Sequence, residues 1–178
     1  MSRLIADASA LVSLGIVTDD DPDPLALCLS RYEVVVPTAV IDELQEIASY
    51  DDVHGHAASA VLDQAESFTT QSVDLDAEFP LDDGENAAVT LANDLDAALF
   101  LCDEFNQLGL IHASLADTRL VTTPTLLSVL VRTEHLSAAD ARLLLDAISD
   151  GRSWGANSYV QRARSLLKGP DTVENTSK

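Results

Sequence analysis

A buried strand that runs directly into a helix is predicted by residues 34–48, Val34-Val35-Val36-Pro37-Thr38-Ala39-Val40-Ile41-Asp42-Glu43-Leu44-Gln45-Glu46-Ile47-Ala48. The three valines form a short continuous apolar run, which Pro37 stops. Pro37 and Thr38 suit the start of a helix, and the apolar residues after them recur at helical spacing. A strand that is apolar on both faces is typical of a parallel sheet covered by helices on both sides.

The same alternation of apolar strands and helical patterns continues along the chain. Further strands are predicted at residues 4–6, 97–102 and 119–122, with an edge strand or extended loop at 68–75. Helices are predicted at 8–15, 25–31, 56–66, 82–95, 124–133, 137–149 and 156–167. We therefore expect an α/β fold, a three-layer α/β/α sandwich with a central, mainly parallel sheet. Residues 1–168 are expected to form one domain, and 169–178 a flexible tail.

Composition indicates a folded protein. The chain has 178 residues, of which 47% are hydrophobic and 22% charged, enough to build a single sizeable core and to exclude wholesale disorder. No apolar run reaches the roughly 18 residues that a membrane helix needs, and Asp7 comes too early for a signal peptide. These features predict a cytoplasmic protein without a membrane segment. Cys28 and Cys102 lie in apolar segments and are expected to be buried thiols.

The charge balance predicts a salt-loving source. The chain has 30 Asp and Glu against 10 Lys and Arg, a formal net charge of -20, and its only lysines are Lys168 and Lys178. Such a surface repels itself in dilute buffer, whereas at ~1 M salt the Debye length falls to roughly 3 Å. A halophilic archaeon is the predicted source, with an ordinary acidic protein as the alternative. The charge argues against tight nonspecific binding of nucleic acid in dilute buffer.

Four carboxylates stand out from the acidic background by their position. Asp7 and Asp103 directly follow apolar strands, so both are expected at the carboxyl edge of the sheet, where such folds place their functional crevice. Glu43 lies beside the apolar stripe of its helix, and Glu85 occupies the inward face of another helix. The alternatives are helix caps for the two aspartates, a solvated boundary position for Glu43, and a capping box in which Glu85 pairs with Asp82.

A shared cation would explain why four acids converge. Carboxylates brought into one crevice repel one another and raise their pKa values unless a positive charge holds them. Oxygen-only ligands select hard cations, which here means Mg²⁺ or Mn²⁺. The pattern therefore predicts a metal site suited to hydrolysis or transfer of a phosphate ester.

The sequence resembles the PIN-domain family of metal-dependent ribonucleases, particularly its free-standing prokaryotic members and the VapC-type toxins. The segments that carry the resemblance are Leu4-Ile5-Ala6-Asp7-Ala8-Ser9, residues 34–44, residues 83–92 and Leu99-Phe100-Leu101-Cys102-Asp103-Glu104. The resemblance implies a PIN-like fold and an acidic quartet of Asp7, Glu43, Glu85 and Asp103, with the Ser9 hydroxyl in support. It also implies cleavage of single-stranded RNA that leaves a 5′-phosphate and a 3′-hydroxyl.

The expected mechanism assigns a role to each acid. Asp7, Glu85 and Asp103 are predicted to hold the Mg²⁺ or Mn²⁺, and Glu43 to orient or deprotonate the attacking water. Ser9 and Glu104 are predicted as supporting groups. The sequence departs from the family pattern at three places. Glu85 stands where many members have Asp, and Cys102 stands where Thr or Ser often precedes the fourth acid. The acidic and uncharged residues 104–107 replace basic ones common after that acid.

Basic and leucine-rich segments near the C-terminus suggest partners. Arg152, Arg162, Arg164 and Lys168 are candidate RNA contacts beside aromatic residues, although a solvated helix face paired with surplus acids is the alternative. The leucine-rich segments 126–131 and 143–148 are expected to be mostly core, with a homodimer face or an antitoxin-binding face as further roles.

Three functions follow for comparison. The first is an endoribonuclease dependent on Mg²⁺ or Mn²⁺, with a toxin of a toxin-antitoxin pair as one form of it. The second is a catalytically weak PIN-like module that binds RNA or protein. The third is a metal-dependent phosphatase, which would turn over small phosphomonoesters.

Overall fold

A five-stranded sheet with all strands parallel forms the centre of the protein. The computed structural model describes residues 1–168, and the strand order is β3-β2-β1-β4-β5. The strands are β1 (Arg3–Ala6), β2 (Glu33–Pro37), β3 (Thr69–Gln71), β4 (Leu99–Leu101) and β5 (Arg119–Val121). Every strand pairing is parallel, which confirms the predicted fold class.

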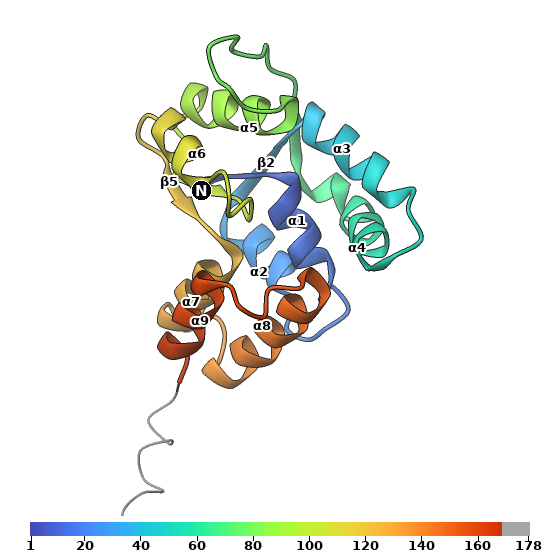
Figure 1. The fold of residues 1–178 in the computed structure, drawn as a ribbon, viewed down its shortest axis with the longest axis vertical. Helices are drawn as coiled ribbons and strands as arrows, with labels where there is room; N and C mark the ends of the chain where they lie inside the picture. The colour runs from blue at the N-terminus through green and yellow to red at the C-terminus, as the bar shows by residue number, and fades with distance from the viewer. Residues whose placement is uncertain (169–178) are drawn as a thin grey trace, which may run out of the picture.

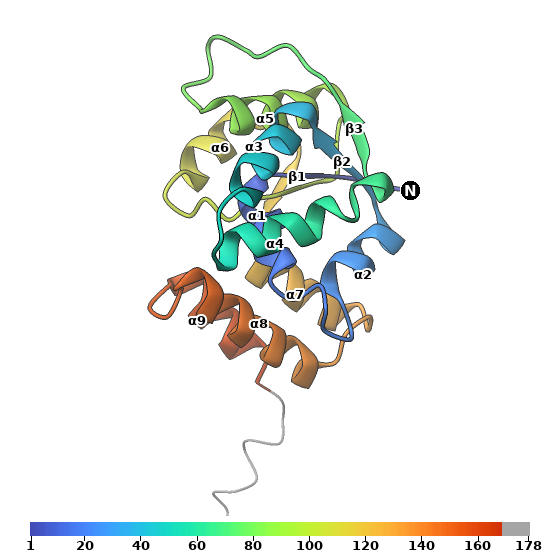
Figure 2. The ribbon, with the colours of Figure 1, turned by 90° about the vertical axis from the view of Figure 1, so that its right-hand side faces the viewer.

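Helices cover both faces of this sheet, with α5 and α6 on one side and most of the others on the opposite side (Figures 1 and 2). The helices are α1 (Ala8–Gly15), α2 (Pro24–Arg31), α3 (Thr38–Ala48), α4 (Val53–Leu62), the short η1 (Ala65–Ser67), α5 (Asp83–Asp94), α6 (Leu108–Ser114), α7 (Thr123–Arg132), α8 (Ala138–Arg152) and α9 (Ser158–Leu166). Figure 2 shows α8 and α9 packed beyond the layer that contains α1, α4 and α7.

Alternating side chains of the strands feed two separate cores. In register with one another, Ile5, Val35 and Phe100 are fully buried beneath α5 and α6. Their neighbours Leu4 and Val34 point to the opposite face and join the larger core around α1 and α7. Because successive strand residues face opposite sides, strands buried on both faces must be apolar throughout. This requirement explains the uninterrupted valine run of β2.

The structure differs from the sequence prediction in three elements. Helix α6, Leu108–Ser114, was not predicted, because it is short and contains Gly109. Helix α4 begins at Val53, earlier than expected, since the Asp52 side chain accepts a hydrogen bond of 2.7 Å from the Gly55 N–H and caps it. Strand β4 covers only the centre of the predicted 97–102 run.

Other predictions are confirmed or fall outside the described residues. Cys28 and Cys102 are buried free thiols. In the part of the chain that the structure describes, none of the helices combines the length and apolar character needed to cross a bilayer. The tail expected at 169–178 lies outside the described residues.

Candidate active site

Acidic side chains from four separate segments lie near enough to one another, beyond the carboxyl ends of the central strands, to interact electrostatically. Asp7 follows β1, and Glu104 comes shortly after β4. Glu43 lies on α3, and Glu85 lies in the first turn of α5, a helix that packs against α3. We call this group of four carboxylates, with the cavity beside it, the acidic cleft. The parallel order of the strands places their carboxyl ends at one edge and so brings these distant residues together.

Asp7 is the most deeply buried acid of the cleft, with 2% of its surface exposed. Its Oδ2 accepts a hydrogen bond of 2.9 Å from the Ser9 hydroxyl. Its Oδ1 is buried and has no hydrogen-bond partner within residues 1–168. Burial raises the pKa of this carboxyl from 3.8 to about 6, and the charge of Glu104 adds to the increase. A buried carboxylate oxygen without a donor is unfavourable, so it calls for a proton or a cation.

The Ser9 hydroxyl connects Asp7 to the end of β4. It donates to Asp7 and accepts a hydrogen bond of 2.9 Å from the backbone N–H of Asp103. The Cys102 thiol lies 3.6 Å from Asp7 Oδ2, and it accepts a 3.4 Å contact from the Glu104 N–H. Burial raises the pKa of Cys102, so this group remains a thiol at neutral pH. Ser9 and Cys102 therefore hold Asp7 in a fixed position.

The N-terminus of α5 presents Glu85 to the cleft. Asp82 is the N-cap of this helix, and its side chain accepts a hydrogen bond of 2.8 Å from the Glu85 N–H. In return, the backbone N–H of Asp82 lowers the pKa of Glu85, as expected for a capping box. Glu85 is nonetheless only 6% exposed and interacts with the charge of Asp7. Glu85 thus belongs to a capping box and also lies among the acids of the cleft.

Gly84 allows the Glu43 carboxylate to approach the backbone of α5. A Cβ atom at position 84 would lie 2.5 Å from Glu43 Oε2, too close for any other residue unless Glu43 moved. The absence of a side chain at this position therefore leaves room for the Glu43 carboxylate against α5.

The cleft acids raise one another's pKa values. Burial raises the pKa of Glu43 and that of Glu85 to about 7 each. The charges that add most to the increase are Asp7, Asp82 and Glu104, together with Glu85 in the case of Glu43. Mutual repulsion of this kind is what a shared cation would relieve.

Asp103, predicted as the fourth acid, is engaged elsewhere. Its Oδ1 accepts a hydrogen bond of 2.7 Å from the Thr123 N–H, and its Oδ2 accepts one of 2.6 Å from the Thr123 hydroxyl. Both oxygens therefore tie the end of β4 to the first residue of α7. Burial raises the pKa of Asp103, whereas the Thr123 bonds and the charge of Arg152 lower it. The role predicted for Asp103 as the fourth acid of the site stays a prediction.

Glu104 and Arg152 line the open part of the cleft. A cavity of about 240 Å³ is lined by Ser9, Val12, Glu43, Ile47, Tyr50, Asp52, His54, Glu104 and Arg152. Arg152 ends α8, and its Cζ lies 5.7 Å from the centre of the Trp154 ring. Its Nε is buried and has no hydrogen-bond partner in the described residues. Burial lowers the pKa of Arg152, while the charges of Asp103 and Glu104 raise it. Arg152 thus brings a positive charge into a cavity that three acidic residues also line.

The four candidate RNA contacts do not form one patch. Arg152 lies in the acidic cleft, and Arg162 lines a different cavity between α7 and α9. Arg164 pairs with Asp146 at 3.0 Å, which agrees with the alternative that these basic residues pair with acids of the protein itself. Lys168 is exposed at the end of the described residues. No sequence signal placed Arg152 in the same cavity as Glu104, because only the tertiary fold brings α8 near the end of β4.

The titration of Asp7 yields a prediction about stability. Because its folded-state pKa is raised, the protonated form is favoured in the fold, so its contribution is present below about pH 4 and is lost as pH rises through 6. In EDTA and molar KCl we expect the free energy of unfolding to fall by roughly 3 kcal/mol over this window on account of Asp7. Asp7→Asn should remove that part of the pH dependence, whereas Asp117→Asn, an exposed loop control, should not. Identical pH profiles of wild type and Asp7→Asn in denaturant titrations would contradict this.

The donor chemistry of the cleft fits a hard divalent cation, although no coordination sphere is already assembled. Carboxylate oxygens are the ligands that Mg²⁺ and Mn²⁺ prefer. Residues 1–168 contain no group of three His, Cys, Asp or Glu side chains close enough together to hold a metal ion. The unpartnered Oδ1 of Asp7 and the raised pKa values of its neighbours are nevertheless the features that a cation would correct. Glu43 and Glu104 are partly exposed, whereas Asp7 and Glu85 are buried.

A comparison with protein families gives a match over most of the chain. The family model DUF3368, described as a PIN domain, matches residues 3–169. A search among curated proteins finds no match. The matched region includes every element and every cleft residue described above.

Proposed function

Because the chain belongs to the PIN-domain family, whose members are generally nucleases, we propose that it is a metal-dependent endoribonuclease that cleaves single-stranded RNA. The observation that carries the proposal is the buried Oδ1 of Asp7, which lacks a hydrogen-bond donor within the described residues and lies among carboxylates of raised pKa. A cation bound there would satisfy that oxygen and relieve the repulsion.

Asp7, Glu85 and Glu104 are the residues that would hold the cation. Glu104 replaces Asp103 in this proposal because both oxygens of Asp103 accept hydrogen bonds from Thr123. When bound, a divalent cation supplies positive charge that favours ionisation of water and neutralises the scissile phosphate. Mg²⁺ and Mn²⁺ both suit these ligands.

Residues of the chain then perform the remaining steps. Glu43, which lines the cleft cavity together with Ser9 and Glu104, accepts the proton of the attacking water. The water oxygen bonds to phosphorus while the bond to the 3′-oxygen breaks, and the departing 3′-oxygen takes up a proton from solvent, which leaves a 5′-phosphate and a 3′-hydroxyl. The Arg152 guanidinium, held over the Trp154 ring, binds a phosphate oxygen. Arg152 thereby supplies the positively charged side chain that residues 104–107 lack.

A catalytically silent RNA-binding module is the second candidate. The observation that favours it is the lack, within residues 1–168, of a preassembled group of three metal-binding side chains. In this case Arg152 would bind phosphate, and the carboxylates would remain partly protonated. The same cleavage experiment separates the two candidates.

The proposal is tested by cleavage of a short unstructured RNA in molar KCl. We expect cleavage with Mn²⁺ or Mg²⁺, loss of cleavage in EDTA, and products with 5′-phosphate and 3′-hydroxyl ends. Binding of RNA without cleavage under every metal condition would favour the silent module. Turnover of a small phosphomonoester without action on RNA would favour a phosphatase instead.

The Gly84 position provides a graded probe of the cleft. Gly84→Ala should push the Glu43 carboxylate away from α5, because the added Cβ would lie 2.5 Å from its Oε2. The displaced atom ends a flexible side chain, so we expect the fold to persist and the cleavage rate to fall about tenfold. Gly109→Ala is the matched control, since a Cβ there has no neighbour within 4 Å. Equal rates of the two variants would argue against a role for the Glu43 position.

Partners other than RNA are proposed from the chemistry of the surface. Leu143 and Leu166 are exposed by 69% and 64%, whereas the other leucines of segments 126–131 and 143–148 are buried core. Exposed leucines on α8 and α9 would suit a homodimer or an antitoxin helix. Light scattering of the purified chain, and co-purification with the product of an adjacent small gene, would test these two partners.

A further inference from the structure

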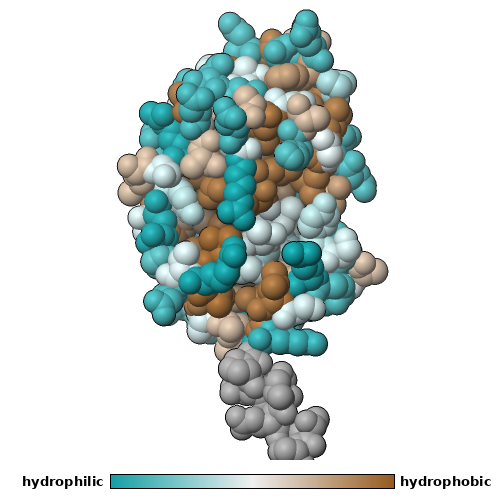
Figure 3. Space-filling view, turned by 90° about the vertical axis from the view of Figure 1, so that its left-hand side faces the viewer, coloured by the Kyte–Doolittle hydropathy of each residue, from teal (hydrophilic) through white to brown (hydrophobic). Residues whose placement is uncertain are grey.

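A second cavity, separate from the acidic cleft, lies between β5, α7 and α9. It has a volume of about 300 Å³ and is lined by Arg119, Thr125, Ser128, Val131, Arg132, Tyr159, Arg162, Ala163, Leu166 and Leu167. Figure 3 shows the side of the molecule that carries these elements, where hydrophilic side chains border exposed apolar surface. We call this cavity the arginine pocket.

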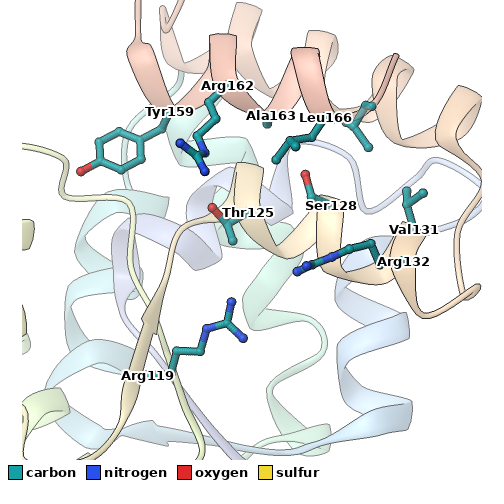
Figure 4. A pocket seen from close by; sticks show the side chains of 10 residues that line it. Arg119, Thr125, Ser128, Val131, Arg132, Tyr159, Arg162, Ala163 and Leu166 are labelled. Atoms are coloured by element: carbon teal, nitrogen blue, oxygen red, sulfur yellow. The ribbon is translucent and has the colours of Figure 1, made fainter. Parts of the chain in front are cut away.

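Three arginines of different elements converge on the pocket. Arg119 begins β5, Arg132 ends α7 and Arg162 lies on α9. Figure 4 shows their guanidinium groups turned toward the same space. The chain has only eight arginines beside Lys168 and Lys178, so more than a third of its arginines meet here.

These arginines have no acidic partner in the described structure. Within residues 1–168 none of the three forms an ion pair, and no Asp or Glu lines the pocket. The chain carries 30 acidic residues, so partners for structural ion pairs are abundant elsewhere on its surface. Arg3 and Arg164, by contrast, pair with Glu33 and Asp146. Three like charges facing one another without an acid favour an anionic ligand.

The remaining walls of the pocket suit the apolar part of a nucleotide. Val131, Ala163 and Leu166 provide an apolar surface, while Thr125 and Ser128 add hydroxyl groups. Tyr159 is 41% exposed, so part of its ring is available to a ligand. A phosphate held by guanidinium groups beside an aromatic ring is the usual chemistry of single-stranded nucleic-acid binding. The volume, near the low end of the roughly 300–1,000 Å³ of ligand pockets, suits one nucleotide.

An aromatic bridge connects the pocket to the acidic cleft. The Tyr159 ring stacks on Phe105 with a centroid distance of 5.1 Å and an interplanar angle of 22°. Phe105 directly follows Glu104, which lines the cleft. Phe105 also meets Trp154 edge to face at 5.0 Å, and Trp154 supports Arg152. The stacked rings of Phe105 and Tyr159 therefore join the edge of the acidic cleft to the arginine pocket.

We propose that the arginine pocket binds a nucleotide of the RNA strand outside the cleavage site, with Arg119, Arg132 and Arg162 on its phosphate and Tyr159 against its base. That the bound strand is the substrate rests on the proposed function. That the pocket suits a nucleotide rests on its own residues. A free nucleotide shares this chemistry and is distinguished by the experiment below.

The experiment measures binding of labelled oligouridylate in EDTA by fluorescence anisotropy. The KCl concentration is the lowest at which circular dichroism shows the fold intact. The triple variant Arg119→Gln, Arg132→Gln, Arg162→Gln is compared with Arg3→Gln, Arg31→Gln, Arg164→Gln, which removes the same charge elsewhere. We expect the pocket variant to weaken binding at least about tenfold and to reduce the slope of log affinity against log salt by about 2. The control variant should bind within about twofold of wild type.

Each outcome decides the proposal. Unchanged oligouridylate binding by the pocket variant, or equal losses in both variants, would overturn it. Binding of AMP or UMP that the pocket variant loses, with oligouridylate binding unaffected, would assign the pocket to a free nucleotide and overturn the strand role. Inorganic phosphate is added as a competitor. If the pocket proved to be a site for a bare anion, that result would also overturn the proposal. Loss of oligouridylate binding by the pocket variant in a protein that cleaves no RNA would support the pocket while the proposed nuclease activity fails.

Discussion

Asp7→Asn should lower kcat/KM for RNA cleavage by at least about a thousandfold while leaving the metal-free fold no less stable than wild type. A thousandfold loss corresponds to about 4 kcal/mol of transition-state stabilisation, in the range expected when an electrostatic group of the reaction is removed. The fold should tolerate the change because Asn is polar and nearly isosteric with Asp. The change also removes a buried carboxyl group, whose pKa is raised to about 6. The Ser9 hydroxyl retains an acceptor at this position.

The measurement for Asp7 pairs a cleavage rate with a melting temperature. Both are recorded in molar KCl with Mn²⁺, and the melting temperature is repeated in EDTA. Asp117→Asn, in an exposed loop, is the control and should match wild type in every assay. Activity of Asp7→Asn within tenfold of wild type would exclude Asp7 from the reaction, whereas a large drop in melting temperature in EDTA would reveal a structural role.

The second large effect separates Glu104 from its neighbour Asp103. Glu104→Gln should reduce cleavage at least about a hundredfold with little change in stability, because Glu104 is partly exposed and lines the cleft. Asp103→Asn should instead destabilise the fold by roughly 1.5–3 kcal/mol, since Thr123 donates two hydrogen bonds to the charged carboxylate. This loss corresponds to a fall in melting temperature of roughly 3–12 °C.

Glu104→Gln and Asp103→Asn are distinguished by whether the cleavage rate or the melting temperature changes. Glu66→Gln, an exposed glutamate remote from the cleft cavity, controls for the loss of one negative charge. If Asp103→Asn lost cleavage a thousandfold at an unchanged melting temperature, Asp103 would belong to the reaction as the sequence predicted. If Glu104→Gln retained full activity, the assignment of Glu104 would fail.

The sheet could be predicted from the sequence because its strands are buried on both faces. Val34-Val35-Val36 and Leu4-Ile5-Ala6 are continuous apolar runs that serve two cores at once. Their short length favours strands over buried helices, and the β-branched valines and the following Pro37 add to that preference in β2. Helix α6 was not predicted because its seven residues, which include a glycine, are too few to show a clear helical spacing of apolar residues.

The choice between Asp103 and Glu104 could not be made from sequence. The two acids are adjacent, and both follow the apolar run that ends in Cys102. Their directions depend on where β4 ends and on the contact of that end with Thr123 of α7. This contact is tertiary, and a pattern of apolar and polar residues carries no information about it. The position of Arg152, which reaches the cleft from α8, has the same origin.

Titration of EDTA-treated protein with Mn²⁺ by calorimetry tests the central claim most directly, because it asks whether the carboxylates of the acidic cleft share a cation. Wild type should show saturable binding that releases protons at pH 6, since Asp7, Glu43 and Glu85 are partly protonated there. Asp7→Asn should lose that binding, whereas Asp117→Asn should keep it. Saturable Mn²⁺ binding that persists unchanged in Asp7→Asn, or its absence from the folded wild-type protein, would contradict the account.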